Sequence, residues 1–174
     1  TNAELARQGG PGMTACLAEY QSAGRGRARR PWASPFGANL YVSLAADVSS
    51  TRAPLGALSL AVGVCVIEAL RDMGAQELAL KWPNDIWADG DKLGGILIEH
   101  RGELGARARL IVGLGLNVSM DRAQAESIDQ PWTRLIDHLP TPPGRNQLAA
   151  AVLEALIQAV DGFEQQGFET FRER

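Results

Sequence analysis

The densest group of side chains capable of chemistry lies at residues 19–32, which read E-Y-Q-S-A-G-R-G-R-A-R-R-P-W. This arginine loop carries four close arginines, at Arg25, Arg27, Arg29 and Arg30. A guanidinium binds a carboxylate or a phosphate through two parallel hydrogen bonds, and the ring of Trp32 offers a face on which a purine could stack. Gly24 and Gly26 give the backbone the freedom that close approach to a ligand requires. The segment therefore predicts a loop that closes on an anion.

Two less specific interpretations stay open from the arginine loop alone. Glycine-arginine runs also occur in RNA-binding tails, and a surface loop can be basic for solubility only. Two phosphate-binding motifs are excluded, because the G-x-G lacks the third glycine of a dinucleotide-binding turn and no G-K-[ST] follows it.

Lysine is scarce, and its two occurrences lie close together. Of the 17 lysines and arginines, only Lys81 and Lys92 are lysines. An arginine-biased composition explains why lysine is scarce, but not why both lysines lie in one short segment. The functional explanation is a site that needs a compact ammonium group, which a planar guanidinium cannot replace. Lys81 opens K-W-P-N-D at residues 81–85, where the proline interrupts strand pairing, so Asn84 and Asp85 are expected to project from a strand end.

Glycines interrupt two apolar strand patterns. K-L-G-G-I-L-I-E at residues 92–99 contains Gly95, and R-L-I-V-G-L-G-L-N-V at residues 109–118 carries Gly113 and Gly115 on one face. Glycine inside a strand indicates a bulge or the close approach of a ligand. Two such strands side by side could form a flat slot, and tight packing of a helix on that face is an equally good explanation.

The remaining pattern supplies the elements that must position these residues. Helices are predicted at residues 1–8 with Asn2 as cap, at residues 54–73, and from Asn146 as cap to residue 166. Strands are predicted at residues 15–20, 39–45, 77–81, 92–99 and 109–118. Turns are expected at residues 88–91 and near residues 102–105, and a loop at residues 124–143 that contains a short helix at residues 132–138. Hairpins mixed with long helices, without regular β-α-β alternation, predict an α+β fold.

Length and composition limit the function classes. A chain of 174 residues with 45% hydrophobic residues is long enough for one well-buried domain. Its net charge of −3 argues against a protein that coats nucleic acid, so the basic charge of the arginine loop is local.

Cysteines and apolar runs indicate the compartment. Cys16 and Cys65 lie in apolar runs, and the two histidines add no metal-binding spacing, so free thiols in a reducing cytoplasm are expected. No membrane-spanning run or signal segment is predicted. Thr1 is not an initiator residue, so we expect the chain to be a portion of a longer protein.

In their order along the chain, the arginine loop, K-W-P-N-D, K-L-G-G-I-L-I-E and V-G-L-G-L-N-V resemble the catalytic domain of bacterial biotin protein ligases. The resemblance covers residues 1–174 as one domain. It implies a fold similar to class II aminoacyl-tRNA synthetases and lipoate ligases, with a mixed, largely antiparallel sheet backed by helices. It also implies an enzyme that forms biotinyl-5′-adenylate from biotin and ATP with Mg²⁺, and then transfers biotin to a lysine of a biotin carboxyl carrier protein.

The resemblance also implies which residues form the site. The biotin-binding residues are Thr1, Asn2, Gln21, Arg25, Gly26, Arg27, Lys92, Gly95, Gly113 and Gly115. The ATP-binding residues are Arg25, Arg27, Arg30, Trp32, Lys81, Asn84 and Asn117. The catalytic residues are Lys92, Arg27 and Asp85. Lys92 would meet the biotin carboxylate and the α-phosphate, and Asp85 would accept a proton from the incoming lysine or hold Mg²⁺.

The chain departs from the family pattern in its loop and in its extent. The family loop usually reads G-R-G-R-R-G-R-x-W, and here Ala28 and Arg29 replace the inner Arg-Gly pair, which restricts backbone freedom. A DNA-binding helix pair and a small C-terminal barrel, present in relatives, are not expected within this chain. DNA binding is therefore not supported, and a homodimer is left open.

Three other functions compete with this interpretation. A lipoate or octanoate ligase could share the fold, although its substrate has no ureido group for Gln21 to bind. A non-catalytic biotin-binding module would keep the pocket without the reaction. An RNA-binding module would depend on the arginine loop alone and predicts affinity that falls steeply with salt.

Overall fold

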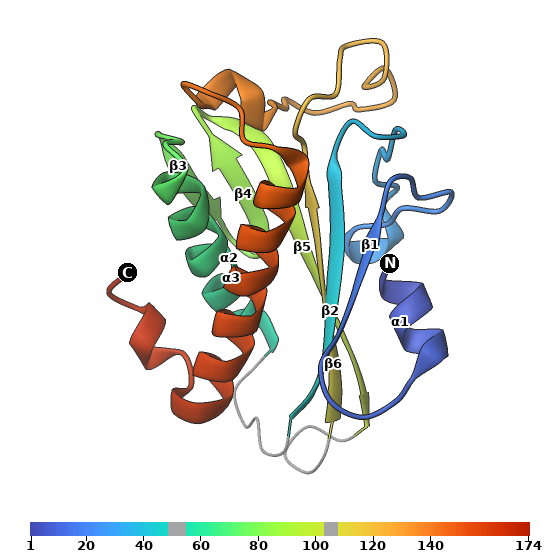
Figure 1. Cartoon of the computed structure of the whole chain (residues 1–174), viewed down its shortest axis with the longest axis vertical. Coiled ribbons are helices and arrows are strands. Elements are labelled where there is room, and N and C mark those ends of the chain that lie inside the picture. The colour runs from blue at the N-terminus through green and yellow to red at the C-terminus, as the bar shows by residue number, and fades with distance from the viewer. Residues whose placement is uncertain (49–54, 103–107) are drawn as a thin grey trace.

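The computed structural model describes residues 1–48, 55–102 and 108–174. It shows one sheet with two long helices packed against one of its faces (Figure 1). The strands are β1 Thr14–Ala18, β2 Leu40–Val48, β3 Leu78–Lys81, β4 Asp85–Ala88, β5 Asp91–Gly102 and β6 Ala108–Leu116. Their order in the sheet is β1-β2-β6-β5-β4-β3, and each neighbouring pair is antiparallel. The predicted α+β fold with a largely antiparallel sheet is confirmed.

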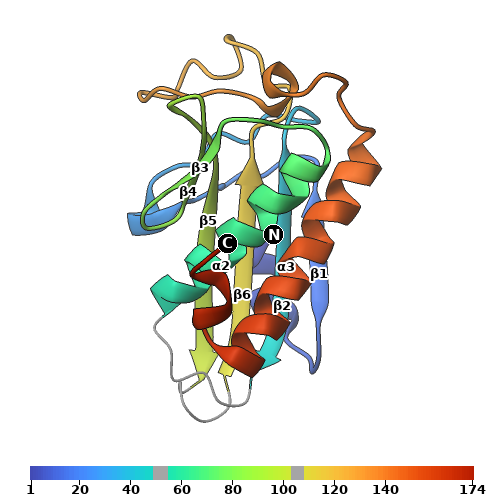
Figure 2. The same cartoon turned by 90° about the vertical axis from the view of Figure 1, so that its left-hand side faces the viewer.

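The helices divide unequally between the two faces of the sheet. They are α1 Asn2–Gln8, α2 Leu55–Asp72 and α3 Arg145–Gln166, with short 3-10 turns η1 Arg27–Arg29, η2 Leu135–His138 and η3 Glu169–Phe171. In Figure 2, α2 and α3 lie in front of the sheet. Apolar side chains such as Val62 of α2, Leu156 of α3 and Leu114 of β6 are buried between the two layers. This helical layer holds the main hydrophobic core.

The opposite face of the sheet is covered only in part. There Leu5 of α1 packs on Ala45 and Ile111. Further along the same face, β5 and β6 carry Gly95 and Gly115 directly opposite each other. Because side chains alternate between the two faces of a strand, this second face is the one that the predicted glycine slot requires.

Two predicted helix caps are wrong. Asn2 is the first residue of α1, whose cap is Thr1 and has no side-chain capping bond. The side-chain amide of Asn2 instead reaches across to the sheet, where the hydroxyl of Ser43 donates to it. Asn146 lies inside α3, which begins one residue earlier. Tertiary contacts fix that start, because the guanidinium of Arg145 donates to the carbonyl oxygens of Gly37 and Asn39.

Most other boundaries agree with the prediction to within a few residues. The predicted turn at residues 88–91 is present, and both Asp89 (φ 49°) and Gly90 (φ 82°) have the positive φ of a type I′ hairpin. The predicted helix start at Pro54 and most of the predicted turn near residues 102–105 fall outside the described residues. Among the described residues, no helix combines the length and apolar character needed to cross a membrane.

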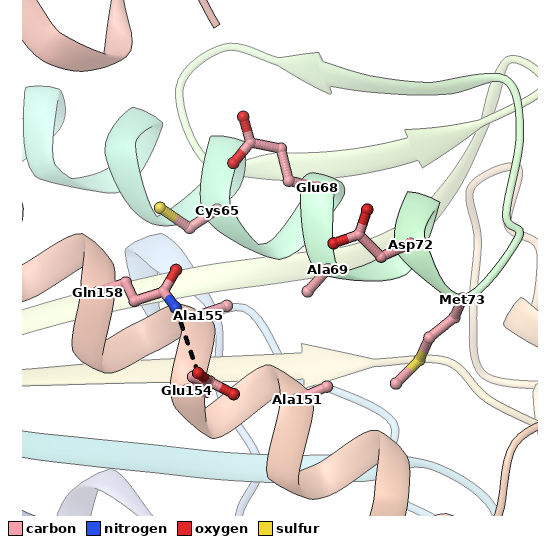
Figure 3. A pocket seen from close by; sticks show the side chains of 9 residues that line it. All are labelled: Cys65, Glu68, Ala69, Asp72, Met73, Ala151, Glu154, Ala155 and Gln158. Carbon is pink, nitrogen blue, oxygen red and sulfur yellow. Dashed lines mark hydrogen bonds between the residues drawn. The ribbon is translucent and has the colours of Figure 1, made fainter.

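A groove between α2 and α3 lies on the helical side of the sheet (Figure 3). It encloses about 300 Å³ and is lined by Glu68, Asp72 and Glu154 among other residues. Gln158 donates to Glu154 across one turn of α3. Burial raises the pKa of the Cys65 thiol at this groove, so the thiol stays protonated at neutral pH.

Tyr41 ties Pro35, three residues after the arginine loop, to the sheet and gives a test of the fold. Its side chain is fully buried on β2, and its hydroxyl donates to the carbonyl oxygen of Pro35 at 3.0 Å. Burial raises the pKa of Tyr41 to about 12, so the phenol remains a donor at neutral pH.

We predict that Tyr41→Phe lowers the free energy of unfolding at pH 7 by about 1 kcal/mol, the contribution of one hydrogen bond. The folded-state pKa lies above the ordinary value of 10, so the phenol stabilises the fold below pH 10 and loses this effect as the pH rises toward 12. The stability difference between parent and variant, measured by urea unfolding, should therefore shrink over that window. An equal difference at pH 9 and pH 11 would contradict the assignment.

Candidate functional site

The arginine loop is a small hairpin held between β1 and β2. The amide of Trp32 donates to the carbonyl oxygen of Gly24 at 2.9 Å, and the amide of Gly26 donates to that of Arg30 at 2.8 Å. A Cβ on Gly24 would lie 2.6 Å from the carbonyl oxygen of Trp32, so this closure requires glycine. The loop therefore has a fixed base and a tip formed by η1.

The tip of the loop is strained. Ala28 has φ 53° and Arg29 has φ 58°, both in the left-handed region. This conformation costs roughly 1–2 kcal/mol for a residue other than glycine. Arg29 stands where the family loop has its glycine, so the predicted departure in the loop falls at a position where glycine would be favoured.

Trp32 lies on the part of the sheet that carries Gly95, Gly113 and Gly115, which we call the glycine floor. A Cβ on Gly115 would come within 2.6 Å of the Trp32 ring, and one on Gly95 within 3.3 Å. The two glycines are therefore in close contact with an aromatic ring and not with a helix. The indole nitrogen of Trp32 is buried and has no hydrogen-bond acceptor among the described residues.

A charged pair borders this floor. Lys92 Nζ lies 2.9 Å from Asp85 Oδ2, and both side chains are mostly buried, with 14% and 23% exposed. Lys92 Nζ also lies 5.5 Å from the centre of the Trp32 ring. The structure thus brings Lys92, Asp85 and Trp32 together from three separate segments of the chain.

Polar groups gather toward the start of α1. The main-chain nitrogen and the hydroxyl of Thr1 donate to Gln21 Oε1 at 3.1 and 3.3 Å. Asn2 accepts a 2.6 Å hydrogen bond from Ser43 and lies where a Cβ on Gly113 would be, 2.3 Å from Asn2 Oδ1. Three predicted biotin-binding residues, Thr1, Asn2 and Gln21, therefore make polar contacts here, and a fourth, Gly113, lies against the amide of Asn2.

Two of the predicted arginines contact side chains of the sheet region. Arg25 donates to Glu99 at 3.0 Å, and both side chains are partly exposed. Arg27 lies 3.4 Å from Asn84 Oδ1, while Asn84 is itself fixed by donating to the carbonyl oxygen of Ile96 at 2.8 Å. These contacts place the loop over β4 and β5.

Within the described residues, three predicted ATP-binding residues form no hydrogen bond or ion pair with the side chains of this cluster. Lys81 lies 3.7 Å from the centre of the Trp87 ring in a cation–π contact. The side chain of Arg30 is exposed. Asn117 is buried and donates to the carbonyl oxygens of Lys92 and Thr133, which fixes the start of β5. Their ATP-binding role stays a prediction.

A second cavity, of about 790 Å³, adjoins the start of β5. It is lined by residues of the segment 120–137 and by Asp91. Trp132 pairs with Lys92 through an isolated parallel bridge, which brings this cavity next to the charged pair. The sequence predicted a loop with one short helix here but no cavity, because contacts between distant segments leave no periodic pattern.

The sequence did not point to Glu99 or Trp87, although both contact predicted site residues. Glu99 follows Gly95 at the alternate positions of β5 and therefore lies on the same face, so the glycine spacing could have indicated it. Trp87 gave no signal, because its contact with Lys81 depends on the pairing of β3 with β4.

The arrangement has three chemical parts. It joins a set of hydrogen-bonding side chains at Thr1, Asn2 and Gln21, a floor of glycines under an aromatic ring, and a cationic border formed by Lys92 and the loop arginines. A ligand with a neutral polar head, an apolar body and a carboxylate tail would match these parts in order. Within the described ranges, no three His, Cys, Asp or Glu side chains are grouped so as to hold a metal ion.

Comparison with known proteins identifies the family. The model of the Biotin/lipoate A/B protein ligase family matches residues 3–117, and the chain belongs to this family. The bifunctional ligase/repressor BirA of Salmonella typhimurium is 42% identical over 160 residues, which are 92% of this chain and 50% of that protein. The biotin--[acetyl-CoA-carboxylase] ligase of Mycobacterium tuberculosis is 36% identical over 164 residues, with 90% and 59% covered. The chain thus spans only half to three fifths of the length of these relatives.

Solved structures confirm the fold. The biotin protein ligase from Aquifex aeolicus in complex with biotin and ATP superposes with a TM-score of 0.81 at 30% identity. The match covers 99% of this chain and 71% of that chain. The predicted similarity to biotin protein ligase catalytic domains is therefore correct.

The strained loop tip gives a prediction with a matched control. Arg29→Gly should raise the free energy of unfolding by about 0.5–1 kcal/mol, because relief of the left-handed strain exceeds the entropy that glycine adds to the unfolded chain. Arg30→Gly removes the same charge at φ −61° and should instead lower stability slightly. Urea unfolding of both variants makes the comparison, and a loss of stability in both would show that Arg29 is not strained.

Proposed function

We propose that this chain is the catalytic domain of an ATP-dependent ligase, which activates biotin as biotinyl-5′-adenylate and transfers it to a lysine of a biotin carboxyl carrier protein. The observation that carries the proposal is the cluster of Lys92, Asp85 and Trp32 on the Gly95–Gly115 floor. The similarity to a solved biotin protein ligase with bound biotin and ATP supports it.

Biotin fits the three parts of the site. Its neutral ureido head would bind at Thr1, Asn2 and Gln21, where donors and acceptors are already gathered. Its apolar rings would lie on the floor of Gly95, Gly113 and Gly115, where they would replace the ring of Trp32 that contacts Gly95 and Gly115 in the ligand-free structure. Its carboxylate would then reach Lys92, whose ammonium is desolvated enough to interact strongly with an anion.

The first reaction step joins two anions. An oxygen of the biotin carboxylate attacks the α-phosphorus of ATP, the bond to the bridging oxygen breaks, and pyrophosphate leaves with the electron pair. Repulsion between carboxylate and triphosphate opposes this approach, so cationic donors arranged in advance lower the barrier. Lys92, Arg25 and Arg27 would supply them, with Gly26 giving the loop close approach and Arg30, Lys81, Asn84 and Asn117 binding other parts of ATP.

The second step transfers the acyl group. The amine of the carrier lysine attacks the carbonyl carbon of the adenylate, AMP leaves, and the amine loses a proton. Asp85 is our candidate for the proton acceptor, because its carboxylate lies at the floor beside Lys92. A loop that covers the adenylate would also protect this reactive anhydride from water.

Magnesium would enter with ATP. Mg²⁺ is commonly held by one or two carboxylates together with the phosphates of the substrate, and Asp85 is the carboxylate that fits this mode. The ion would offset negative charge on the phosphates.

The two cysteines are free thiols, which suits a reducing cytoplasm.

A lipoate or octanoate ligase is the alternative, since the family description includes lipoate. The polar side chains of Thr1, Gln21, Asn2 and Ser43 favour biotin, because a ureido head can exchange hydrogen bonds with them and a lipoyl head cannot. The test is pyrophosphate release on mixing with ATP, Mg²⁺ and either biotin or lipoate. Release with biotin alone supports the proposal, release with lipoate alone replaces it, and binding of biotin without release indicates a non-catalytic module.

Lys92→Arg separates charge from geometry. The exchange keeps the positive charge and should retain much of the biotin affinity, because a guanidinium also attracts the carboxylate. The guanidinium is bulkier and planar, so it cannot follow the negative charge that develops at the α-phosphate during the reaction. The rate of pyrophosphate release should therefore fall roughly a hundredfold, as when one preorganised donor is removed.

The control is Arg101→Lys at the other end of β5, where the arginine donates to the carbonyl oxygen of Ala6. This variant should release pyrophosphate at the parent rate. A Lys92→Arg rate within a few-fold of the parent would remove Lys92 from the reacting centre.

A further inference from the structure

Glu99 contacts two residues that we assign to ligand recognition. Its Oε2 accepts a 2.9 Å hydrogen bond from Asn2 Nδ2, and its Oε1 accepts a 3.0 Å hydrogen bond from Arg25. Asn2 comes from α1 and Arg25 from the arginine loop, so one carboxylate on β5 joins both segments. Gly95 and Glu99 lie on the same face of β5, so Glu99 belongs to the row that carries the glycine floor.

The contact with Asn2 fixes the orientation of its amide. An ionised carboxylate can only accept hydrogen bonds, so the NH₂ group of Asn2 must face Glu99. The carbonyl oxygen of Leu97, 3.3 Å from Asn2 Nδ2, enforces the same orientation. Asn2 Oδ1 then points to Ser43, which donates to it at 2.6 Å. Because Asn2 is buried, with 8% of its surface exposed, this orientation decides what the amide can offer to a ligand.

The contact with Arg25 has a different character. Glu99 and Arg25 keep 36% and 49% of their side chains exposed. A solvent-exposed pair of this kind is weak, and the guanidinium can therefore exchange one carboxylate for another anion. Glu99 thus presents Arg25 with an anionic oxygen acceptor, as a carboxylate or a phosphate of a ligand would.

We propose that Glu99 is a positioning residue that orients Asn2 for the neutral head of the ligand and occupies Arg25 until an anionic ligand displaces it. This inference rests on the proposed function for the identity of the ligand. It predicts that two different substitutions of Glu99 distinguish the contact with Asn2 from the contact with Arg25. Glu99→Gln keeps an acceptor for Asn2 but removes the charge that holds Arg25, whereas Glu99→Ala removes both contacts.

The first measurement needs no ligand. Trypsin cleavage after Arg27 or Arg29, followed by mass spectrometry, reports release of the arginine loop. Cleavage in the ligand-free protein should be several-fold faster in Glu99→Gln and Glu99→Ala than in the parent. Glu169→Gln removes a carboxylate from another exposed pair, with Arg172, and should leave loop cleavage unchanged.

The second measurement is calorimetry with biotin and with a non-hydrolysable biotinyl-adenylate analogue. Glu99→Ala should bind biotin about tenfold more weakly, because the amide of Asn2 loses its partner. Glu99→Gln should bind biotin within about threefold of the parent, yet bind the anionic analogue several-fold more tightly, because no internal carboxylate competes for Arg25.

Equal loop cleavage in parent and Glu99→Gln would overturn the contact with Arg25, and parent-like biotin affinity in Glu99→Ala would overturn the contact with Asn2. Urea unfolding of each variant identifies a merely structural effect, which would weaken biotin and analogue alike in both variants and so contradict the proposal. A parent that binds no biotin would refute the proposed function, while the trypsin comparison would still decide whether Glu99 holds the loop.

Discussion

The direct pairing of Gly95 with Gly115 is the constraint on which the rest of the site depends. Because neither glycine has a side chain, the two strands leave a shallow area at this point of the face, and the ring of Trp32 approaches the backbone there. The arginine loop is brought down onto the sheet by this contact. Lys92 and Asp85 then border the ring instead of lying in open solvent. A β-carbon on Gly115 would move Trp32 and with it the whole cationic border.

Charge is arranged locally and is compensated inside the protein. The chain has a net charge of −3, yet its face with the glycine floor combines Lys92 with several arginines. In the ligand-free state Asp85 pairs with Lys92, and Glu99 pairs with Arg25. Anionic ligands would therefore exchange with carboxylates of the protein and not with water alone, which favours ligands that meet several cations at once.

The sequence predicted the elements better than their contacts. Strand alternation and glycine spacing located the β5–β6 pair, because both signals are local and periodic. The role of Asn2 as a helix cap was predicted from its residue type, but the competing hydrogen bonds to Ser43 and Glu99 come from strands more than 40 residues away. Glu99 itself was overlooked although it continues the glycine row. The cavity beside Trp132 could not be predicted, since it forms only where an irregular segment pairs with the start of β5.

The most direct test of the account is the position of biotin bound to this chain, determined by crystallography of the complex. The account predicts that the ureido head lies within hydrogen-bond distance of Gln21 or Asn2, that the rings lie over Gly113 and Gly115, and that the carboxylate lies within salt-bridge distance of Lys92. Biotin bound with its carboxylate away from Lys92, or bound outside the glycine floor, would contradict the account.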